Sequence, residues 1–421
     1  MRSKIITALD IGTTFIKSLT VLEKPDSQDF EILSRIKIPN FGMRKGVVAK
    51  PEEVSQKIIS VLEEAEKETG HRIKDVYANI GGSHLFLASS KGSVVISRVD
   101  RSISQEDIDR SIDTAKVLSL PPNKEVIYFF PKQFIVDGVE GIKEPLGMKG
   151  IRLETEILSV CAFSPYFKNL TEACLDADVQ ISDVICNSIA SANACLTPRQ
   201  KELGAVLLDI GGGTTDFAVY EEGDLIHLGV IPIGSEHVTN DIAIGLRTDT
   251  KIAEEIKKEF GRCNPSKMNK PKEDSSKKSR KRGKIEVPLA SLSFSEKFLT
   301  KIIEARISEI FNLVQKEIKK VSSGILPAGV IITGGAAKLP NIVDLAKKEL
   351  KLPCRIGLPI VKQGEIEESE FLGENEKDPS FSTAWGLILS GMSDYEPEGR
   401  FPLLGKGITD RIKKIIRTFI P

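Results

Sequence analysis

Long apolar runs are missing from this sequence. No stretch approaches the roughly 18 consecutive apolar residues that a membrane-spanning helix requires. The first ten residues, MRSKIITALD, also lack the apolar core of a secretory signal and pass almost directly into a predicted strand. We therefore expect a cytoplasmic protein without a spanning segment.

Cysteine is scarce, and an excess of either charge is absent. The six Cys residues show no Cys-x-x-Cys spacing, so they indicate no zinc or redox motif, and we expect reduced, mostly buried thiols. The formal net charge is zero, which provides no overall positive field for nucleic acid, and we expect no nucleic-acid partner. A chain of 421 residues is too long for a single core and predicts two or more domains.

The most informative stretch that is present covers residues 205–220, AVLLDIGGGTTDFAVY. It predicts two buried strands joined by a tight glycine turn whose backbone can approach a ligand closely. Backbone N–H groups and hydroxyls of this turn form a row of donors suited to phosphate, from Gly211, Gly212, Gly213, Thr214 and Thr215. Asp209 and Asp216 are placed to hold a hydrated Mg²⁺. A glycine-rich hairpin without a ligand is the alternative interpretation.

The same pattern occurs near the start of the chain. Residues 7–20, TALDIGTTFIKSLT, repeat Asp-Ile-Gly followed by Gly or Thr. A third element, residues 330–341 (VIITGGAAKLPN), predicts a strand that runs into Gly334 and Gly335 and then a helix. Two such hairpins facing each other across a nucleotide, followed by this adenosine motif, resemble the actin/Hsp70/hexokinase superfamily.

That resemblance implies ATP and Mg²⁺ as ligands and assigns residues to three groups. The residues expected to contact the phosphates are those of the 211–215 turn together with Gly12, Thr13, Thr14, Lys17, Gly234 and Ser235. The metal would be held through water by Asp10, Asp209 and Asp216. Adenosine would contact Glu254, Lys257, Gly334, Gly335, Ala336 and Lys338. For Glu254 and Lys257, a solvated charged helix is the alternative.

One segment points to a particular family. Residues 141–160, GIKEPLGMKGIRLETEILSV, resemble the signature of the bacterial cell-division family FtsA, whose subdomain 1C replaces subdomain 1B of actin. The family commonly has a His shortly after Arg-Leu-Glu, where this chain has Ile157 and Leu158. We interpret this as a packing exchange within a strand. The fold class implied is α/β, an actin-like (ribonuclease H-type) two-domain ATPase fold with the FtsA-type 1C subdomain.

The resemblance also implies a division of the chain into subdomains. The expected parts are 1A at 1–80, 162–203 and 373–391, 1C at 81–161, 2A at 204–238 and 323–372, 2B at 239–322, a linker at 392–406 and an amphipathic helix at 407–421. Within 2B, residues 264–284 are densely basic with almost no apolar residues, which predicts a disordered loop. The strand predicted at 93–97, the strands at 125–130 and 132–136 and the loop at 138–150 would belong to 1C.

Two residue patterns bear on turnover and partners. Hsp70-like ATPases have a water-orienting Glu where this chain has Asn187, so hydrolysis should be slow or absent. A polar stripe of Arg306, Glu309 and Asn312 lies on the long helix predicted at 294–321. In FtsA this helix binds the C-terminal tail of the tubulin-like protein FtsZ, although a polar helix face is usually only solvated.

The last residues form the second functional element. Residues 407–421, GITDRIKKIIRTFIP, place Ile408, Ile412, Ile415, Ile416 and Phe419 on one helix face, with Arg411 and Lys414 among the cations beside it. A helix of this length is too short to cross a bilayer and fits one lying among anionic headgroups. It resembles the membrane-targeting helix of FtsA. A helix docked on the protein's own core is the alternative.

These observations combine into one functional prediction. The chain should bind ATP, polymerise on the cytoplasmic face of the cell membrane at the division site and anchor FtsZ filaments there. Expected partners are the FtsZ tail, further copies of the chain, an anionic membrane and, through 1C, other division proteins. Two alternatives are a PilM-like actin homologue of pilus assembly and a sugar or metabolite kinase on the same fold.

Overall fold

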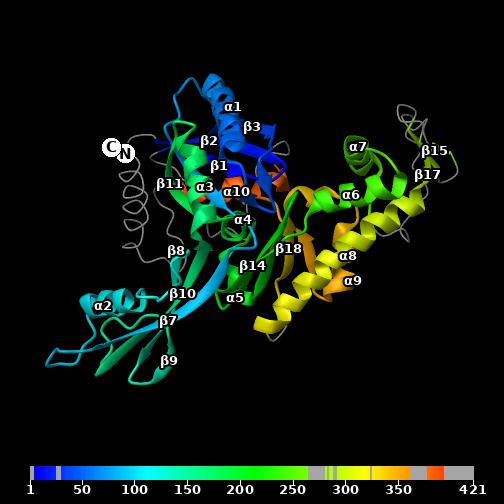
Figure 1. Ribbon diagram of the computed structural model, residues 1–421. Coiled ribbons are helices and arrows are strands. Elements are labelled where there is room, and N and C mark those ends of the chain that lie inside the picture. The colour runs from blue at the N-terminus through cyan, green and yellow to red at the C-terminus, as the bar shows by residue number, and fades with distance from the viewer. Residues whose placement is uncertain are drawn as a thin grey trace.

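The computed structural model describes residues 4–24, 30–263, 280–281, 284–287, 292–322, 325–360 and 377–392. Two α/β domains pack against each other, and a third unit is inserted into the first of them (Figure 1). The first domain contains a five-stranded sheet in the order β11-β6-β1-β2-β3. Its strands are β1 (Lys4–Ile11), β2 (Phe15–Glu23), β3 (Phe30–Pro39), β6 (Asp75–Ile80) and β11 (Gln180–Cys186). A small hairpin, β4 (Met43–Arg44) and β5 (Val47–Val48), follows β3.

Helices contact both faces of this first sheet. On one side are α1 (Pro51–Thr69) and α3 (Ser164–Leu175), and on the other are α4 (Asn187–Cys195) and α10 (Ser382–Gly391), preceded by the 3₁₀ turn η4 (Pro379–Phe381). Helix α1 illustrates how the sequence sets the bounds. Pro51 fits the first turn, where its missing N–H costs nothing, and Gly70 ends the helix in the left-handed conformation at φ 70°.

The second domain has its own five-stranded sheet, in the order β14-β13-β12-β18-β19. Its strands are β12 (Ala205–Ile210), β13 (Thr215–Glu221), β14 (Asp224–Ile231), β18 (Gly329–Thr333) and β19 (Cys354–Ile356). Strand β12 is buried along its whole length. Val206 and Leu208 belong to the core of the second domain, whereas Ala205 and Leu207 join the core of the first. The glycine turn after β12 therefore lies where the two domains meet.

Helices cover the outer part of the second domain. These are α5 (Pro198–Leu203), α6 (Ser235–Leu246), α7 (Thr250–Phe260), the 26-residue α8 (Glu296–Val321), α9 (Ile342–Leu350) and the 3₁₀ turn η3 (Gly335–Lys338). A small sheet of β15 (Arg280–Lys281), β16 (Lys284–Val287) and β17 (Leu292–Ser295) adjoins one end of α8 (Figure 1).

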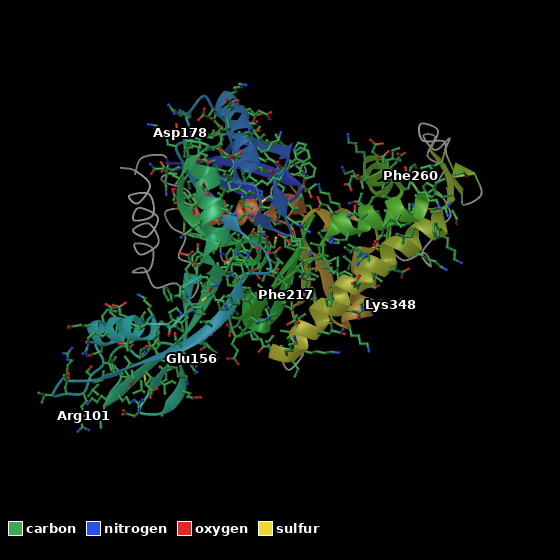
Figure 2. The ribbon with its side chains drawn as sticks, in the orientation of Figure 1. Arg101, Glu156, Asp178, Phe217, Phe260 and Lys348 are labelled. Atoms are coloured by element: carbon green, nitrogen blue, oxygen red, sulfur yellow. The ribbon has the colours of Figure 1, made fainter. Side chains whose placement is uncertain are left out.

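The inserted unit leaves the first domain after β6 and projects away from both sheets (Figure 1). It has a four-stranded sheet in the order β7-β10-β8-β9, from β7 (Phe86–Val95), β8 (Lys124–Val136), β9 (Val139–Ile142) and β10 (Arg152–Phe163), with α2 (Gln105–Ala115) packed on it. A small apolar core of its own includes Ile108, Ile112 and Leu153. Figure 2 shows Arg101 at the far end of this unit.

Several sequence predictions are confirmed. The sequence predicts strands at 30–39 and 354–356 and helices at 51–69 and 342–350, and the structure has β3, β19, α1 and α9 over these residues. The stretch Ser104-Gln105-Glu106-Asp107 predicts a capped helix start. At the start of α2 the Ser104 hydroxyl accepts from the N–H of Asp107, whose carboxylate accepts from the Ser104 N–H. All six cysteines are free and buried.

Among the described residues, no helix is both long and apolar enough to cross a membrane.

Other boundaries were wrong. The strand predicted at 93–97 is the end of β7, which starts at Phe86. The two strands predicted at 125–130 and 132–136 are one strand, β8, because Pro131 lies at a shift in its pairing with β10 and the strand passes through it. The loop predicted at 138–150 contains β9. The last residues of the basic segment, Arg280–Lys281 and Lys284, form strands, while residues 264–279, 282–283 and 393–421 lie outside the described part of the chain.

Candidate functional site

A cavity of about 470 Å³ lies between the two domains, where the three glycine-containing motifs meet. It is lined by residues from both domains, so neither domain forms the site alone. The predicted residues that line it are Asp10, Gly12, Thr13, Thr14, Lys17, Asp209, Gly211, Gly212, Gly213, Thr214, Asp216, Ser235, Glu254, Lys257, Gly334, Gly335, Ala336 and Lys338. The two Asp-Ile-Gly turns, about 200 residues apart in the sequence, thus meet at one cavity, as predicted.

Two predicted residues lie outside the cavity lining. The Thr215 hydroxyl is buried and donates a 2.8 Å hydrogen bond to the carbonyl oxygen of Ile233. Gly234 caps α6 and packs so closely that a Cβ there would lie 2.4 Å from the carbonyl oxygen of Gly212. Both residues shape the turn without lining the cavity, and their role as phosphate contacts stays a prediction.

The two hairpin turns touch each other across the cavity. A Cβ on Gly212 would lie 1.8 Å from Thr14 Oγ1, and a Cβ on Gly213 would lie 2.7 Å from Thr13 Oγ1. A side chain at either position would have to displace the threonine opposite to it, which favours glycine at both. Thr14 Oγ1 also donates a 3.0 Å hydrogen bond to Glu236 Oε1 at the start of α6. Small, donor-rich backbone on both sides suits an anionic group bound between the turns.

Three aspartates lie beside these turns, and two of them have well-defined partners. Asp10 accepts from Lys17 Nζ at 2.7 Å and from Asn79 Nδ2 at 3.0 Å. Asp209 Oδ2 accepts from Ser191 Oγ at 2.6 Å and from Thr383 Oγ1 at 3.1 Å. Ser191 and Thr383 belong to the first domain, so Asp209 connects the two domains at the floor of the cavity.

The third aspartate is incompletely satisfied. Asp216 Oδ2 accepts from Thr214 Oγ1 at 2.8 Å, but the buried Oδ1 has no hydrogen-bond partner among the described residues. Burial, and after it the negative charge of Asp209, raises the pKa of Asp216 to about 7, and burial also raises the pKa of Asp209. A cation or a cation-bound water near Oδ1 would relieve both effects.

The described residues contain no group of three or more His, Cys, Asp or Glu side chains placed to hold a metal directly. Asp10 accepts hydrogen bonds at both carboxylate oxygens and Asp209 accepts them at Oδ2. Asp216 Oδ1 is buried and has no hydrogen-bond partner in the described part of the chain. This arrangement fits Mg²⁺ that keeps most of its water shell better than one enclosed by carboxylates.

The other end of the cavity is formed by α7 and η3. Glu254 accepts from Thr239 Oγ1 and pairs with Lys257 Nζ, both at 2.6 Å, and Lys257 also donates to Thr239 at 2.7 Å. Burial opposes ionisation of Glu254, but the bonds from Lys257 and Thr239 outweigh it and lower the pKa. On the facing side, Lys338 pairs with Asp378 at 2.7 Å. These charges are held in place before any ligand binds.

Some residues that line the cavity were not predicted. Lys37, Lys258 and Glu236 add two cations and one carboxylate to the lining. Asn79, buried beside the site, accepts from the Ile11 N–H at 2.6 Å and orients Asp10. None of these residues belongs to a glycine-rich motif in the sequence. The structure identifies them as site residues because they lie beside the predicted motifs.

Asn187 stands at the first position of α4 and lines the cavity. Its Oδ1 accepts from Asn79 Nδ2 at 2.9 Å, and its side chain lies close enough to Asp216 to favour the ionised form of that carboxylate. An amide therefore occupies the predicted location, next to the carboxylates. An amide is not a general base, which is consistent with the prediction of slow turnover.

The polar stripe predicted on α8 is engaged within the chain. Arg306 pairs with Asp241 of α6 at 2.7 Å and also with Glu309. Asn312 Nδ2 donates to the carbonyl oxygen of Ser308 at 2.8 Å. Glu309 and Asn312 remain exposed, so the stripe is accessible, but binding a peptide there would compete with the Arg306–Asp241 pair.

Comparisons with known proteins agree with this architecture. A family model described as "Cell division protein FtsA" matches residues 206–386, and one described as "SHS2 domain inserted in FTSA" matches residues 82–161. Cell division protein FtsA of Pseudomonas aeruginosa is 34% identical over 394 residues, which cover 92% of this chain and 89% of that protein. The protein of the same name from Bacillus subtilis is 31% identical, covering 94% and 86%.

Solved structures are similar at the level of fold. The chain in the "PilM-PilN type IV pilus biogenesis complex" matches with a TM-score of 0.62 at 16% identity, covering 93% of this chain and 99% of that one. The ethanolamine utilization protein EutJ from Carboxydothermus hydrogenoformans matches with a TM-score of 0.50 at 15% identity, covering 92% and 90%. The fold is accordingly the actin-like ATPase fold, with two α/β domains around a central cavity.

Proposed function

The chain belongs to the FtsA family of cell-division proteins, and on that basis we propose that it binds ATP with Mg²⁺ and tethers FtsZ filaments to the cell membrane. One observation carries the nucleotide part of this proposal. The cavity between the domains is lined by both Asp-Ile-Gly turns and by the third glycine motif, from three separate parts of the chain. A ligand that contacts all three motifs would account for this arrangement.

The chemistry of the lining suits a nucleoside polyphosphate. The turns at Gly12–Thr14 and 211–214 would bind the phosphates, and Lys17 would supply positive charge beside them. Adenosine would lie between η3 and α7, near Gly335, Glu254 and Lys257. Mg²⁺ would be held through water by Asp10, Asp209 and Asp216, where it would neutralise phosphate charge. We infer that ATP acts mainly as a conformational ligand, because Asn187 offers no base to activate water.

Membrane attachment is proposed from the sequence of residues 407–421, which lie outside the described part of the structure. Five large apolar residues on one helix face and several cations beside them fit an anionic bilayer surface. One copy should bind weakly, since so short a helix must order as it binds. Polymerisation on the cytoplasmic face at the division site would strengthen attachment by linking many weak contacts.

The remaining partners are proposed from family membership. The FtsZ tail would bind the α8 region of the second domain, near Arg306, Glu309 and Asn312. Other division proteins would contact the inserted unit, whose far end projects freely from the rest of the molecule (Figure 2).

The alternatives have less support. PilM shares the fold at 16% identity, whereas the FtsA relatives reach 34% over most of both chains. A sugar or metabolite kinase would need a carboxylate base beside the phosphates and a substrate pocket. At Asn187 the chain has an amide where such a base would stand, and the inserted unit projects away from the cavity and so forms no substrate pocket there.

A co-pelleting experiment tests the proposal. The purified chain should sediment with anionic liposomes when ATP and Mg²⁺ are present, and FtsZ should sediment only when the chain is also present. Neutral liposomes provide the matched control, because they remove the electrostatic part of the attraction. FtsZ that stays in the supernatant while the chain itself pellets would contradict the tether function.

A further inference from the structure

Lys37 faces the same cavity as the predicted phosphate residues. In the sheet of the first domain it pairs with Lys17, which in turn pairs with Asp10 on the next strand. Residues directly opposite one another on neighbouring strands point to the same face of a sheet. Asp10, Lys17 and Lys37 therefore form a row that runs across the cavity wall, and all three line the cavity.

The Lys37 ammonium differs from the other cations of the cavity in its partners. Lys17 pairs with Asp10 at 2.7 Å, Lys257 with Glu254 at 2.6 Å and Lys338 with Asp378 at 2.7 Å. Lys258 also reaches Glu254, at 3.4 Å. Lys37 Nζ lies over the Phe15 ring, 4.3 Å from its centroid, and in the described part of the chain it has neither an ion pair nor a hydrogen bond.

The surroundings of Lys37 make that lack of an anion unfavourable. Burial of part of the side chain, and after it the positive charges of Lys17 and Lys338, lowers the pKa of Lys37 to about 8. The negative charge of Asp378 opposes this shift. A phosphate between these side chains would remove the repulsion. The cavity wall thus carries an exposed cation that has no anion beside it among the described residues.

Position suggests which phosphate this is. Lys37 lies directly opposite Lys17, at the phosphate end. Arg35, two residues away on the same face of β3, contacts Asp378, and Asp378 pairs with Lys338 of the adenosine motif. An ammonium between the phosphate end and the adenosine end of the cavity would lie beside the phosphates that are next to the ribose. We propose that Lys37 binds these ribose-proximal phosphates, which ATP and ADP share, and so contributes to affinity for both nucleotides. This inference rests on the proposed nucleotide site.

Titration calorimetry with ATP, ADP and adenosine tests the assignment. In Lys37→Met, affinity for both ATP and ADP should fall about tenfold, as expected for loss of one charged hydrogen bond, while adenosine affinity is unchanged. Lys37→Arg should retain binding near the wild-type level. Lys124→Met is a matched control, since Lys124 is also exposed and lies 4.4 Å from a ring centroid, that of Phe86, but does not line the cavity.

A pH series separates a charge contact from a packing role. Wild-type affinity for ATP should fall as pH rises through about 8, because a neutral amine binds phosphate poorly, and this fall should be absent in Lys37→Arg. Lys17, Lys338, Lys258 and Asp378 face Lys37 and are retained in the variant, so the difference between the two profiles isolates Lys37.

The other results would contradict either the role of Lys37 or the nucleotide site. Unchanged binding of ATP and ADP by Lys37→Met would overturn the assignment, and so would a loss confined to ATP or a loss that includes adenosine. Wild-type protein that binds neither ATP nor ADP would instead contradict the proposed nucleotide site itself.

Discussion

The hydroxyl of Thr14 donates a 3.0 Å hydrogen bond to the carboxylate of Glu236, which joins the first domain to the second across the mouth of the phosphate turns. Glu236 is a carboxylate that lines a cavity proposed to bind polyphosphate. The bond therefore holds the two domains together while placing negative charge where the ligand would be repelled. A cavity of this kind should be partly closed before ATP binds and should exchange this bond for contacts to phosphate.

Glu236→Gln tests whether the negative charge of Glu236 weakens ATP binding. The amide oxygen can still accept from Thr14, but the negative charge is removed, so ATP should bind more tightly, by roughly fivefold or about 1 kcal/mol. Isothermal titration at low and moderate salt measures the effect, which should shrink as salt screens the charge. Weaker ATP binding in this variant would mean that Glu236 contacts the ligand favourably.

Gly335→Val tests the adenosine end of the cavity. A Cβ on Gly335 would meet no atom within 4 Å, and its φ angle is not positive, so the variant should fold with an unchanged melting temperature. The side chain would instead occupy space proposed for adenosine. Nucleotide should then fail to raise the melting temperature, whereas for wild type a hundredfold excess over Kd adds about 2.7 kcal/mol. A retained thermal shift would place the nucleotide elsewhere.

Asp216→Asn tests the electrostatics beside the turns. In the unfolded chain an Asp ionises near pH 4, but burial raises the pKa of folded Asp216 to about 7. Folding therefore takes up a proton between these values, and wild-type stability should decline as pH rises from about 4 to 7. Asn avoids this cost, so without nucleotide and Mg²⁺ the variant should be more stable than wild type at pH 8, by roughly 2–4 kcal/mol.

Denaturant unfolding at pH 5 and pH 8 measures this difference. The advantage of Asp216→Asn should be smaller at pH 5, and Mg²⁺ with ATP should narrow it at pH 8 because a nearby cation favours the ionised carboxylate. Asp113→Asn is the control, since Asp113 is largely exposed and paired only with Lys116. Equal pH dependence in wild type and Asp216→Asn would show that Asp216 ionises normally.

Turnover should be slow. Because Asn187 cannot act as a base, phosphate release by the purified chain should stay well below about 1 s⁻¹, the low end of typical enzyme rates. Asn187→Ala should change the rate by no more than a few-fold if Asn187 only hydrogen-bonds to its neighbours. Release of many phosphates per second would overturn this view of ATP as a conformational ligand.

The membrane contact can be removed without disturbing the cavity. Phe419→Glu puts a charge on the proposed apolar face of residues 407–421, and each large side chain there should contribute about 1 kcal/mol or more when buried. This variant, and a chain truncated after Lys406, should stay in the supernatant with anionic liposomes while binding ATP like wild type. A truncated chain that still pellets, or that loses its fold, would falsify the tether model.

Local signals in the sequence predicted much of this fold. Pro51 and Gly70 mark the ends of α1, and Ser104 marks the start of α2, because caps and left-handed turns depend on single residue types. The paired Asp-Ile-Gly turns predicted a shared cavity through their resemblance to the actin/Hsp70/hexokinase superfamily. The lining of the cavity agrees with that inference.

Other features could not be predicted from local sequence. Pro131 suggested a break in β8, but a proline is tolerated where the pairing with a neighbouring strand shifts. Thr214 and Thr215 look equivalent in sequence, yet Thr215 begins β13, and only Thr214 faces the cavity. In the sequence, Lys37 is one of many charged residues on a predicted strand. Its position in the cavity wall depends on how the second domain packs opposite β3.

The inserted unit enters and leaves the first domain through neighbouring strands. Phe86, at the start of β7, pairs directly with Cys161, near the end of β10. A segment whose two ends lie side by side can be gained, lost or exchanged in one genetic event, since the host needs only to close a short gap. The core sheet and the unit that it carries could therefore have separate histories. The same adjacency marks this pair of strands as the place to graft a foreign domain onto the chain.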